Sequence, residues 1–525
     1  MFQPKKLLVL LLALLMVLTA FTACNIDRGN EDESTTPETD SGTSTDDKGT
    51  TGSGSDTSDD TNEIPSPIAN VRFDGQVLKV LSWKASNITE YEEEITESST
   101  VIEQAVFNRC DYTESRLNIK TTWNLIAGTS SNPEFIDTAD RQNSNGGEND
   151  VIVSVSSFAH SLTTRGVLSN LRRYEYFGDF AHPAWPESLL DDITVGNKLY
   201  FSTGDISTNL IFMTSVVFFN KDLVKDLDIN SKVQEYWGAA DLYELVTSGK
   251  WTLDKMIKLC EDTYHDNNND GIKNRGDRFG LNTYNSLLNN FYYGGGYTTI
   301  SVDGDSFSVD PAFLDAELIG GILEQVNDFI HDSKDGFYEG GTNPFTPVQQ
   351  EFAAGNVLFS LAPASHAYHT YSNTEDLSYS VLPVPKHNES QDRYSCTQSF
   401  PYSMYCIASQ AKNAKIASAF LEGLAEESYE TTRPALFDKM MKGRYAEDPE
   451  DAEMWEYAVD ANVFDVGRVF CEAFGKDRNE QLTVNLFLRR IIDDNENWSS
   501  VLSSYAMPLT TYAAGLAGEI MALPD

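Results

Sequence analysis

The first 67 residues constrain the fold most, because neither of their two segments is expected to join a packed core. Residues 1–23 carry Lys5 and Lys6 near their start, continue with an unbroken apolar run of 12 residues and end in small residues, a pattern typical of an export signal. A helix that spans a bilayer needs roughly 20 apolar residues, so we expect a removed signal peptide and not a permanent anchor. Residues 24–67 are almost entirely polar, and residues 25–64 hold 12 acidic and 2 basic residues, so we expect a disordered acidic linker.

The signal ends in Thr22, Ala23 and Cys24, and this ending resembles the lipobox of bacterial lipoproteins. The resemblance implies cleavage before Cys24 and attachment of lipid to its sulfur. One residue departs from the pattern, since Phe21 stands where a lipobox usually has Leu. The protein is therefore expected outside the cytoplasm, held by lipid to the outer face of the cytoplasmic membrane. The alternative is an ordinary secretory signal that happens to precede a cysteine.

The body that begins at Ile68 has about 455 residues, more than one hydrophobic core usually supports, so we expect two or more domains. The chain is 40% hydrophobic and 11% aromatic, which is typical of a soluble globular protein. The formal net charge of −42 argues against nucleic acid as a partner, because its phosphates would be repelled. The same charge argues against docking on anionic lipid through a basic patch.

Five cysteines remain after Cys24, an odd number, so at least one thiol is unpaired unless it bridges to another chain. Cys396 and Cys406 are close enough in sequence to close a small hairpin, although spacing alone does not establish a disulfide. No Cys-x-x-Cys pair occurs, which argues against a zinc knuckle. The pairing stays open among Cys110, Cys260, Cys396, Cys406 and Cys471.

Short strand patterns alternate with helical patterns along the body. Residues 76–83, 119–125 and 150–155 favour strands, and residues 101–117 carry apolar side chains near helical spacing. Residues 213–220 form a further strongly apolar run that we expect to be a strand. Strands that alternate with helices indicate α/β sheets and not a β-sandwich.

Five short segments follow one another in a characteristic order. They are GNKLY at 196–200, VFFNKDL at 217–223, GKWTLD at 249–254, FAAGNV at 352–357 and YSVLPVP at 379–385. Together, behind a lipoprotein signal, they resemble segments of the extracellular solute-binding proteins of carbohydrate-type ABC importers, and the resemblance covers most of residues 76–427. Within the third segment, Thr252 is expected to cap the helix that follows.

The resemblance implies a periplasmic-binding-protein-like α/β fold, with two discontinuous α/β lobes joined by a hinge. The implied function is the capture of a sugar or oligosaccharide by hinge closure and its delivery to an ABC permease, by a monomer that is not an enzyme. We expect the chain to cross between lobes near residues 204–209, near residues 388–399 and again after Ser428. The expected lobes are 68–205 with about 396–430, and 206–395 with about 431–525.

The alternative function is that of a lipid-anchored extracellular glycoside hydrolase. Such an enzyme needs two carboxylates at a set separation. Among 80 acidic residues, pairs of carboxylates are so common that they do not indicate an active site. The sequence contains no Gly-x-Ser-x-Gly elbow, no His-Glu-x-x-His and no phosphate-binding loop. We therefore predict no catalytic residue.

Residues 266–277 have the spacing of a calcium-binding loop. Oxygen-bearing side chains stand at loop positions 1, 3, 5, 9 and 12, Gly271 stands at the sharp turn of position 6, and position 7 supplies a backbone carbonyl. Asp277 departs from the pattern, because position 12 usually holds a bidentate Glu. The shorter Asp side chain should weaken calcium binding. The alternative is a plain polar turn. The expected ligands of a structural calcium ion are Asp266, Asn268, Asp270, Ile272, Asn274 and Asp277.

Loops that follow strands are the expected solute contacts, because α/β sheets bind ligands at the carboxyl ends of their strands. Sugars need flat apolar faces and a few well-placed polar groups, and for each candidate an ordinary place in the core is the alternative. His366 and His369 are three residues apart, but no third ligand is apparent, so a metal pair is not expected. The expected solute contacts are Trp83, Ser157, Phe158, Asp205, Tyr292, Tyr293, His366 and Tyr402.

Overall fold

The computed structural model describes residues 65–84, 90–127, 134–340, 345–470, 490–491 and 496–524. The signal peptide, Cys24, Cys471 and the linker before Pro65 lie outside the described residues, so the predictions that concern them stay predictions. All described residues belong to one compact unit, residues 63–525. None of the described helices is both long enough and apolar enough to cross a bilayer.

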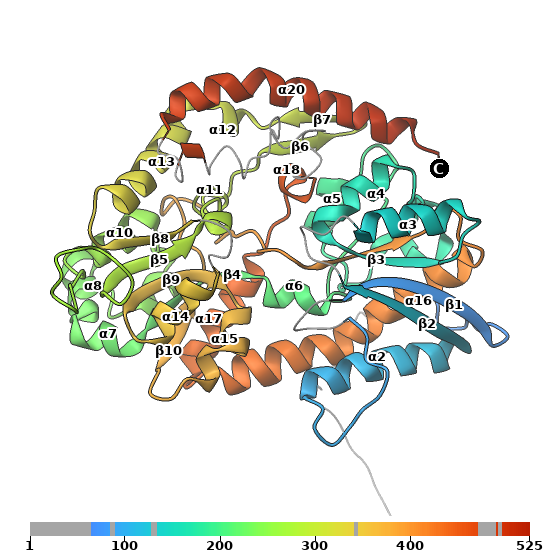
Figure 1. Cartoon of the computed structure of the whole chain (residues 1–525), viewed down its shortest axis with the longest axis horizontal. Coiled ribbons are helices and arrows are strands. Elements are labelled where there is room, and N and C mark those ends of the chain that lie inside the picture. Colours follow the sequence, from blue (N-terminus) through green and yellow to red (C-terminus); the bar gives the residue numbers. More distant parts are fainter. Residues whose placement is uncertain are drawn as a thin grey trace, which may run out of the picture. The chain divides into compact units, whose positions relative to one another are not determined.

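The first sheet contains four strands in the order β11 (Ser403–Ile407), β3 (Val151–Val155), β1 (Gln76–Lys84) and β2 (Ile119–Ala127). β1 is parallel to β2 and to β3, so these three strands end at one edge (Figure 1). β11 is antiparallel to β3, with Ser403 opposite Val155, and therefore begins at that same edge. β3 and β11 are buried along their full length, as expected for strands that are covered on both faces.

The second sheet contains five strands in the order β10 (Tyr379–Leu382), β4 (Ser215–Asn220), β9 (Val357–Pro363), β5 (Phe279–Tyr284) and β8 (Gly336–Glu339). β5 is parallel to β8 and β9. β4 is antiparallel to β9 and β10, and Ser215 lies opposite Pro363. β4 therefore begins at the edge where the other four strands end.

Helices surround both sheets, and the helix that residues 101–117 predict is confirmed. It begins with a capping box, in which the Thr100 hydroxyl accepts from the Glu103 N–H at 3.2 Å and the Glu103 carboxylate accepts from the Thr100 N–H at 2.6 Å. The described helices are α2 (Val101–Leu117), α3 (Glu134–Ser144), α4 (Ala159–Thr164), α5 (Glu187–Ile193), α6 (Thr208–Phe212), α7 (Lys221–Asp226), α8 (Ile229–Trp237), α9 (Leu242–Thr247), α10 (Leu253–Cys260), α11 (Asn290–Tyr293), α12 (Pro311–Leu314), α13 (Ala316–His331), α14 (Phe345–Ala353), α15 (Ser365–His369), α16 (Ala414–Glu427), α17 (Pro449–Asp460), α18 (Val466–Val469) and α20 (Trp498–Ala522).

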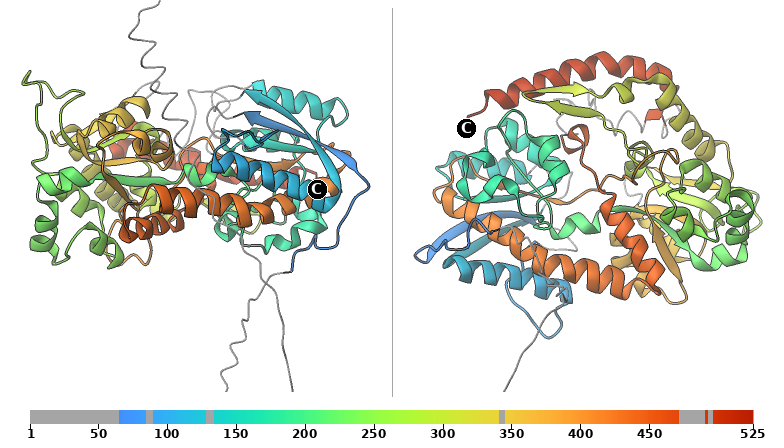
Figure 2. Two further views of the ribbon diagram at one scale, coloured as in Figure 1. Left: turned by 90° about the horizontal axis from the view of Figure 1, so that it is seen from below. Right: turned by 180° about the vertical axis from the view of Figure 1, so that it is seen from behind.

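Each sheet draws on separated parts of the chain, and within the described residues three segments connect the two sheets. We call residues 203–214 the first crossing and residues 396–402 the second crossing. The third is a continuous helical run: α16 packs on α2, continues through the π-helical turns Ser428–Thr432 and Ala435–Lys442, and α17 then packs on β10 (Figure 2). The fold is thus two discontinuous α/β lobes joined by a hinge, while the lobe boundaries given above stay predictions.

Two local expectations differ from the structure. The strand expected over residues 213–220 begins only at Ser215, because Met213 closes α6 with its N–H on the carbonyl oxygens of Asn209 and Leu210. Thr252 occupies the N-cap of α10, but its hydroxyl caps no backbone group. Its backbone pairs instead with Lys386, which places Thr252 in a bridge between two segments and buries its side chain.

The described cysteines form no disulfide. Cys110, Cys260, Cys396 and Cys406 are all buried and free. The hairpin bridge between Cys396 and Cys406 that the spacing allowed is therefore absent, because Cys396 lies in the second crossing while Cys406 lies inside β11. Burial raises the pKa of the Cys396 thiol to about 12, so this thiol stays protonated and unreactive.

Candidate functional site

The first and second crossings run beside each other between the carboxyl edges of the two sheets. At the first sheet, the Thr203 hydroxyl donates to the carbonyl oxygen of Ser403 at 2.8 Å. At the second sheet, the Ser215 hydroxyl donates to the carbonyl oxygen of Thr397 at 2.6 Å. Ser403 and Ser215 are the first residues of β11 and β4, so the carboxyl edges of the two sheets meet at the crossings. Ligands of open α/β sheets bind at such edges.

Asn290, the first residue of α11, fixes the second crossing to the second sheet. Its side-chain oxygen accepts from the Thr397 N–H at 2.9 Å, and its side-chain nitrogen donates to the Ser215 hydroxyl at 3.1 Å. Asn290 is fully buried, and it uses both ends of its amide. One side chain thus sets where the second crossing meets β4.

A buried ion pair anchors the first crossing to the first sheet. Arg109 of α2 donates to the Glu90 carboxylate at 3.2 Å, and both side chains are at most 1% exposed. Glu90 also accepts from the Thr208 N–H at 2.9 Å, from the Asn209 side chain at 2.9 Å and from the Tyr405 hydroxyl at 2.9 Å. We call Glu90 and Arg109 with these partners the ionic hub.

Arg109, the other member of the ionic hub, also bonds to the third connection between the sheets. Arg109 donates to the carbonyl oxygen of Ile206 at 2.6 Å and to the Ser428 hydroxyl at 3.0 Å. Burial alone would raise the pKa of Glu90, but the Arg109 charge and the hydrogen-bond donors outweigh burial and hold this pKa below its ordinary value. Glu90 is therefore ionised at neutral pH, and the hub ties α2 to two of the three connections.

Three polar side chains that follow β3 lack a hydrogen-bond partner among the described residues. They are Ser156, Ser157 and His160, which are 1%, 3% and 6% exposed. Burial lowers the pKa of His160 to about 3, so the imidazole is neutral and keeps one donor and one acceptor. Buried polar groups normally have partners, so this cluster is suited to a ligand or to water that brings hydroxyl groups.

The crossings carry two further hydroxyls of the same kind. Thr208 of the first crossing and Thr397 of the second crossing are buried, and neither hydroxyl has a partner within the described part of the chain. Both residues use their backbone N–H groups, on Glu90 and on Asn290 respectively. The crossings thus fix the backbone at these two positions and leave the hydroxyls available.

Four of the expected solute contacts come together at the carboxyl edge of the first sheet. Trp83 is 3% exposed, and its indole N–H donates to the Ser403 hydroxyl at 2.8 Å. Phe158 stacks on Phe135 with ring centroids 6.5 Å apart. Tyr402 stacks on the ring of Phe400 at 6.1 Å, and the fourth residue is Ser157. All four are buried, and their contact with solute stays a prediction.

Of the other four expected contacts, Asp205 lies in the first crossing, which begins at this edge with Thr203, and the remaining three belong to the second lobe. Each of the four bonds to the protein. Tyr292 donates to the carbonyl oxygen of Thr298 at 2.7 Å, and Tyr293 donates to Asp465 at 3.3 Å. A ring nitrogen of His366 lies 3.2 Å from the Tyr371 hydroxyl. Asp205 lies 3.5 Å from Arg433, yet burial outweighs this charge and raises the pKa of Asp205 to about 7. Their contact with solute likewise stays a prediction.

Sequence reasoning passed over His160 and the ionic hub. His160 stands two residues after Phe158 in the same loop, so the rule that selected Ser157 and Phe158 also covers it. Glu90 belongs to an acidic stretch that is typical of a solvated surface, and Arg109 lies within an ordinary helical pattern. Nothing local pairs these two residues, because only the packing of α2 against the first crossing brings them together.

The candidate calcium loop is held by its own hydrogen bonds. Asp266 accepts from the Gly271 N–H at 2.8 Å, and Asp270 accepts from the Ile272 N–H at 2.7 Å. Gly271 has φ +76°, the left-handed conformation that the sharp turn requires. Asp277 is fully buried and accepts from the Asn274 N–H at 3.1 Å. These contacts fit both a plain turn and a loop ready for calcium, so the calcium site stays a prediction.

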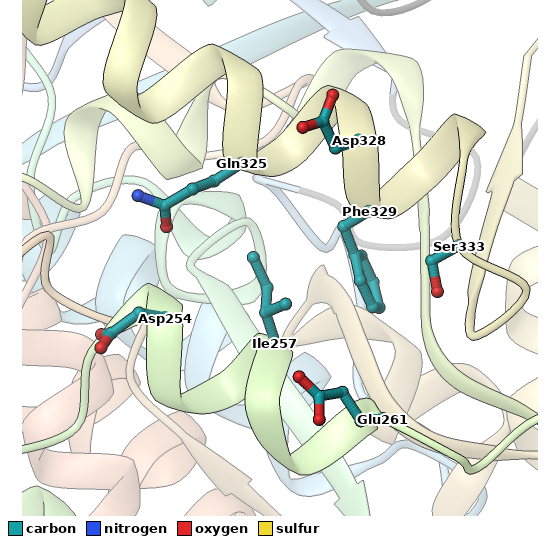
Figure 3. A pocket seen from close by; sticks show the side chains of 7 residues that line it. All are labelled: Asp254, Ile257, Glu261, Gln325, Asp328, Phe329 and Ser333. Carbon is teal, nitrogen blue, oxygen red and sulfur yellow. The ribbon is translucent and has the colours of Figure 1, made fainter.

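A groove of about 420 Å³ lies between α10 and α13 (Figure 3). Ile257 and Phe329 face each other across it. Asp254, Glu261 and Asp328 are among the other lining residues. All of its lining residues come from α10, α13 and the segments next to them, so the groove belongs to the second lobe and shares nothing with the site at the crossings.

Comparisons with known proteins define the fold. No family model matches the chain, and no curated protein matches it. Among solved structures, the galacto-N-biose-/lacto-N-biose I-binding protein of the ABC transporter from Bifidobacterium longum, in complex with lacto-N-biose, is similar with a TM-score of 0.51 at 12% identity, over 85% of this chain and 98% of that one.

Two further solved structures give the same result. The ABC substrate-binding protein from Listeria monocytogenes, in complex with cycloalternan, has a TM-score of 0.50 at 14% identity, over 84% of this chain and 99% of that one. M. tuberculosis UspC has a TM-score of 0.50 at 13% identity, over 84% of this chain and 100% of that one. The chain therefore has the two-lobed α/β fold of ABC solute-binding proteins.

Proposed function

We propose that the protein is a solute-binding protein that captures a sugar or oligosaccharide between its two lobes and delivers it to an ABC permease. The observation that carries the proposal is the meeting of the two carboxyl edges at the crossings, where buried hydroxyls and a neutral imidazole have no hydrogen-bond partner among the described residues. Two similar structures were solved with lacto-N-biose and with cycloalternan, and both ligands are carbohydrates rich in hydroxyl groups.

Binding would proceed by hinge closure. A solute that contacts both carboxyl edges makes more contacts in the closed form than in the open form, so it shifts the equilibrium toward closure. Ser156, Ser157 and His160 would supply donors and acceptors from the first lobe. These three groups are uncharged at neutral pH, which suits a neutral, hydroxyl-rich guest.

The N-terminal segment would hold this body near its permease. Lipid on Cys24 would anchor the chain to the outer face of the cytoplasmic membrane, and the acidic linker would act as an extended spacer, since its like charges repel one another. We also propose that the 266–277 loop binds calcium in a structural role, because extracellular calcium sites work at roughly millimolar affinity and tolerate an imperfect ligand set.

The test is a titration that also measures turnover. Isothermal titration calorimetry with lacto-N-biose, cycloalternan and linear maltooligosaccharides should give stoichiometric binding of at least one sugar, with no product released during long incubation. Release of hydrolysis products would instead support the glycoside hydrolase. Heat from none of the carbohydrates would remove sugar as the solute class.

Two substitutions test the cluster that follows β3. Ser157→Ala nearly keeps the side-chain volume and His160→Phe keeps a flat ring, and both remove the hydrogen-bonding groups, so each should weaken sugar binding about 10-fold. In His160→Phe the removal of buried nitrogens without partners among the described residues favours folding and the larger ring disfavours it, so the variant should remain folded with a melting temperature close to that of the wild type. Ser231→Ala on the exposed face of α8 is the matched control. Full affinity in both variants would exclude the cluster from the site.

A further inference from the structure

A hairpin and a long helix form an arm of the second lobe. The hairpin consists of β6 (Ile300–Asp303) and β7 (Ser306–Val309), which lie in the chain between α11 and α12, and α20 packs along β7 (Figure 1). At the start of α20, the Trp498 indole N–H donates to Glu324 of α13 at 3.1 Å. Its ring lies on Gly320, where an added Cβ would come within 2.6 Å of the ring.

The far end of this arm reaches the first lobe. The Gly196 N–H donates to the carbonyl oxygen of Gly304, at the tip of the hairpin, at 2.6 Å. The Lys198 ammonium donates to the carbonyl oxygens of Leu523 and, at 3.1 Å, of Met521 at the end of α20. The Tyr200 hydroxyl donates to the carbonyl oxygen of Pro524 at 3.1 Å. A cation at the carboxyl end of a helix also complements the helix dipole.

Residues 195–200 belong to the first lobe, because their neighbours do. The Leu199 N–H donates to the Asn170 side chain at 3.1 Å, and Ser202 pairs with Tyr405 of β11. The fit around Gly196 is close: a Cβ there would lie 3.1 Å from the sulfur of Met521 and 3.7 Å from Asp305 of the hairpin. The hairpin and the end of α20 thus both approach Gly196, whose φ is +59°.

Aromatic side chains also pack between the hairpin and the first lobe. Phe307 of β7 is 4% exposed, and its ring lies 6.0 Å from that of Phe470. Phe470 also lies 5.4 Å from Phe201 and 5.5 Å from His160, both of the first lobe. Separation of the hairpin from the first lobe would expose these rings to water, which disfavours it.

We propose that the β6–β7 hairpin and α20 act as a clasp, which the second lobe closes on residues 195–200 of the first lobe. The inference rests on the proposed function, since it concerns the hinge motion of a solute-binding protein. The clasp contacts lie outside the connections described above, so a rotation that separates the lobes on this side would break them. Contacts that an open form lacks favour closure independently of solute.

The test removes the contacts of α20 and follows a contact that belongs to the hairpin. Lys198→Met with Tyr200→Phe removes the hydrogen bonds to α20 and leaves the bond from the Gly196 N–H to Gly304 chemically intact. Hydrogen exchange of the full chain, measured by mass spectrometry without solute, should become about 10-fold faster at Gly196 in the double variant. The Thr397 N–H, which donates to the Asn290 side chain at 2.9 Å within the second lobe, should keep its exchange rate. Small-angle scattering should show a larger maximum dimension.

Controls separate a clasp from ordinary packing. Lys415→Met removes an exposed pair with Glu175 at 2.7 Å within the first lobe and should change neither reading. Tyr200→Phe alone keeps the ring and repeats the test if the double variant does not fold. Fraying confined to residues 520–524, with Gly196 still protected and the scattering unchanged, would overturn the clasp. Because no solute is used, this result is independent of whether the protein binds sugar.

Discussion

Replacement of Arg109 by Met tests whether the ionic hub holds the crossings in place. The substitution keeps most of the side-chain length but removes the charge and the donors to Glu90, Ile206 and Ser428. Glu90 would remain ionised at neutral pH in a site where its side chain is 1% exposed. Its other partners survive, namely the Ser207 hydroxyl, the Thr208 N–H, the backbone and side chain of Asn209 and the Tyr405 hydroxyl.

The expected loss in the free energy of unfolding is large because one buried charge is left without its counter-charge. Breaking a buried pair by removal of one partner costs about 3–5 kcal/mol, and the total stability of a domain is about 5–15 kcal/mol. The loss should depend on pH with a definite sign. In the wild type the pKa of Glu90 lies below its ordinary value of 4.5, so its stabilisation is present above that value and is lost only in stronger acid.

In the variant the direction of this shift reverses. Burial is the largest influence on Glu90, so without Arg109 its pKa should lie above 4.5. A raised pKa means that stability is lost as the pH rises through it, and the variant should therefore regain stability between pH 7 and pH 5. Urea unfolding at both pH values measures the difference, and Arg165→Met, which removes an exposed pair with Asp137, is the control with an expected loss below about 1 kcal/mol. A loss below about 1 kcal/mol for Arg109→Met at pH 7 would refute the reasoning.

Two further predictions concern Asp205 and the calcium loop. The pKa of Asp205 is raised from 3.8 to about 7, so its contribution to stability is complete at low pH and is lost between pH 4 and pH 7. Asp205→Asn should therefore raise the melting temperature relative to the wild type at pH 8 but not at pH 4, and an equal difference at both pH values would contradict this. Chelation by EDTA should lower the melting temperature by about 1–3 °C, and calcium should restore it. Asp270→Asn should abolish this response. If EDTA and calcium leave the melting temperature of the wild type unchanged, residues 266–277 form a plain turn.

The sequence predicts the fold where the signal is local. The helix at residues 101–117 and the strands near residues 76–83 and 119–125 follow from periodicity and residue type, and the structure confirms them. Sheet order is not local. β11 joins the first sheet from far along the chain, and no feature of residues 403–407 names β3 as its partner. Only the ordered family segments indicated that each lobe would be discontinuous.

The site was less accessible to sequence reasoning because its groups depend on what packs around them. Trp83 stands at the end of a strand, as the rule requires, yet its N–H is already used by Ser403. His160 matters because burial leaves it neutral and without a hydrogen-bond partner among the described residues, and neither property can be read from its neighbours in sequence. Glu90 and Arg109 illustrate the same limit, since their pairing exists only in the folded protein.

The anchors at the two lobes restrict where the hinge can bend. On the first lobe, the ionic hub fixes the first crossing as far as Asn209, and Thr203 fixes it to β11. On the second lobe, Asn290 fixes the second crossing at Thr397 and β4 at Ser215. The backbone rotation of the proposed closure should therefore fall between these anchors, in a few residues of each crossing, and in the helical run beyond Ser428. We expect so short a hinge to favour one direction of rotation, which would bring contacts as distant as the proposed clasp into register when the lobes close.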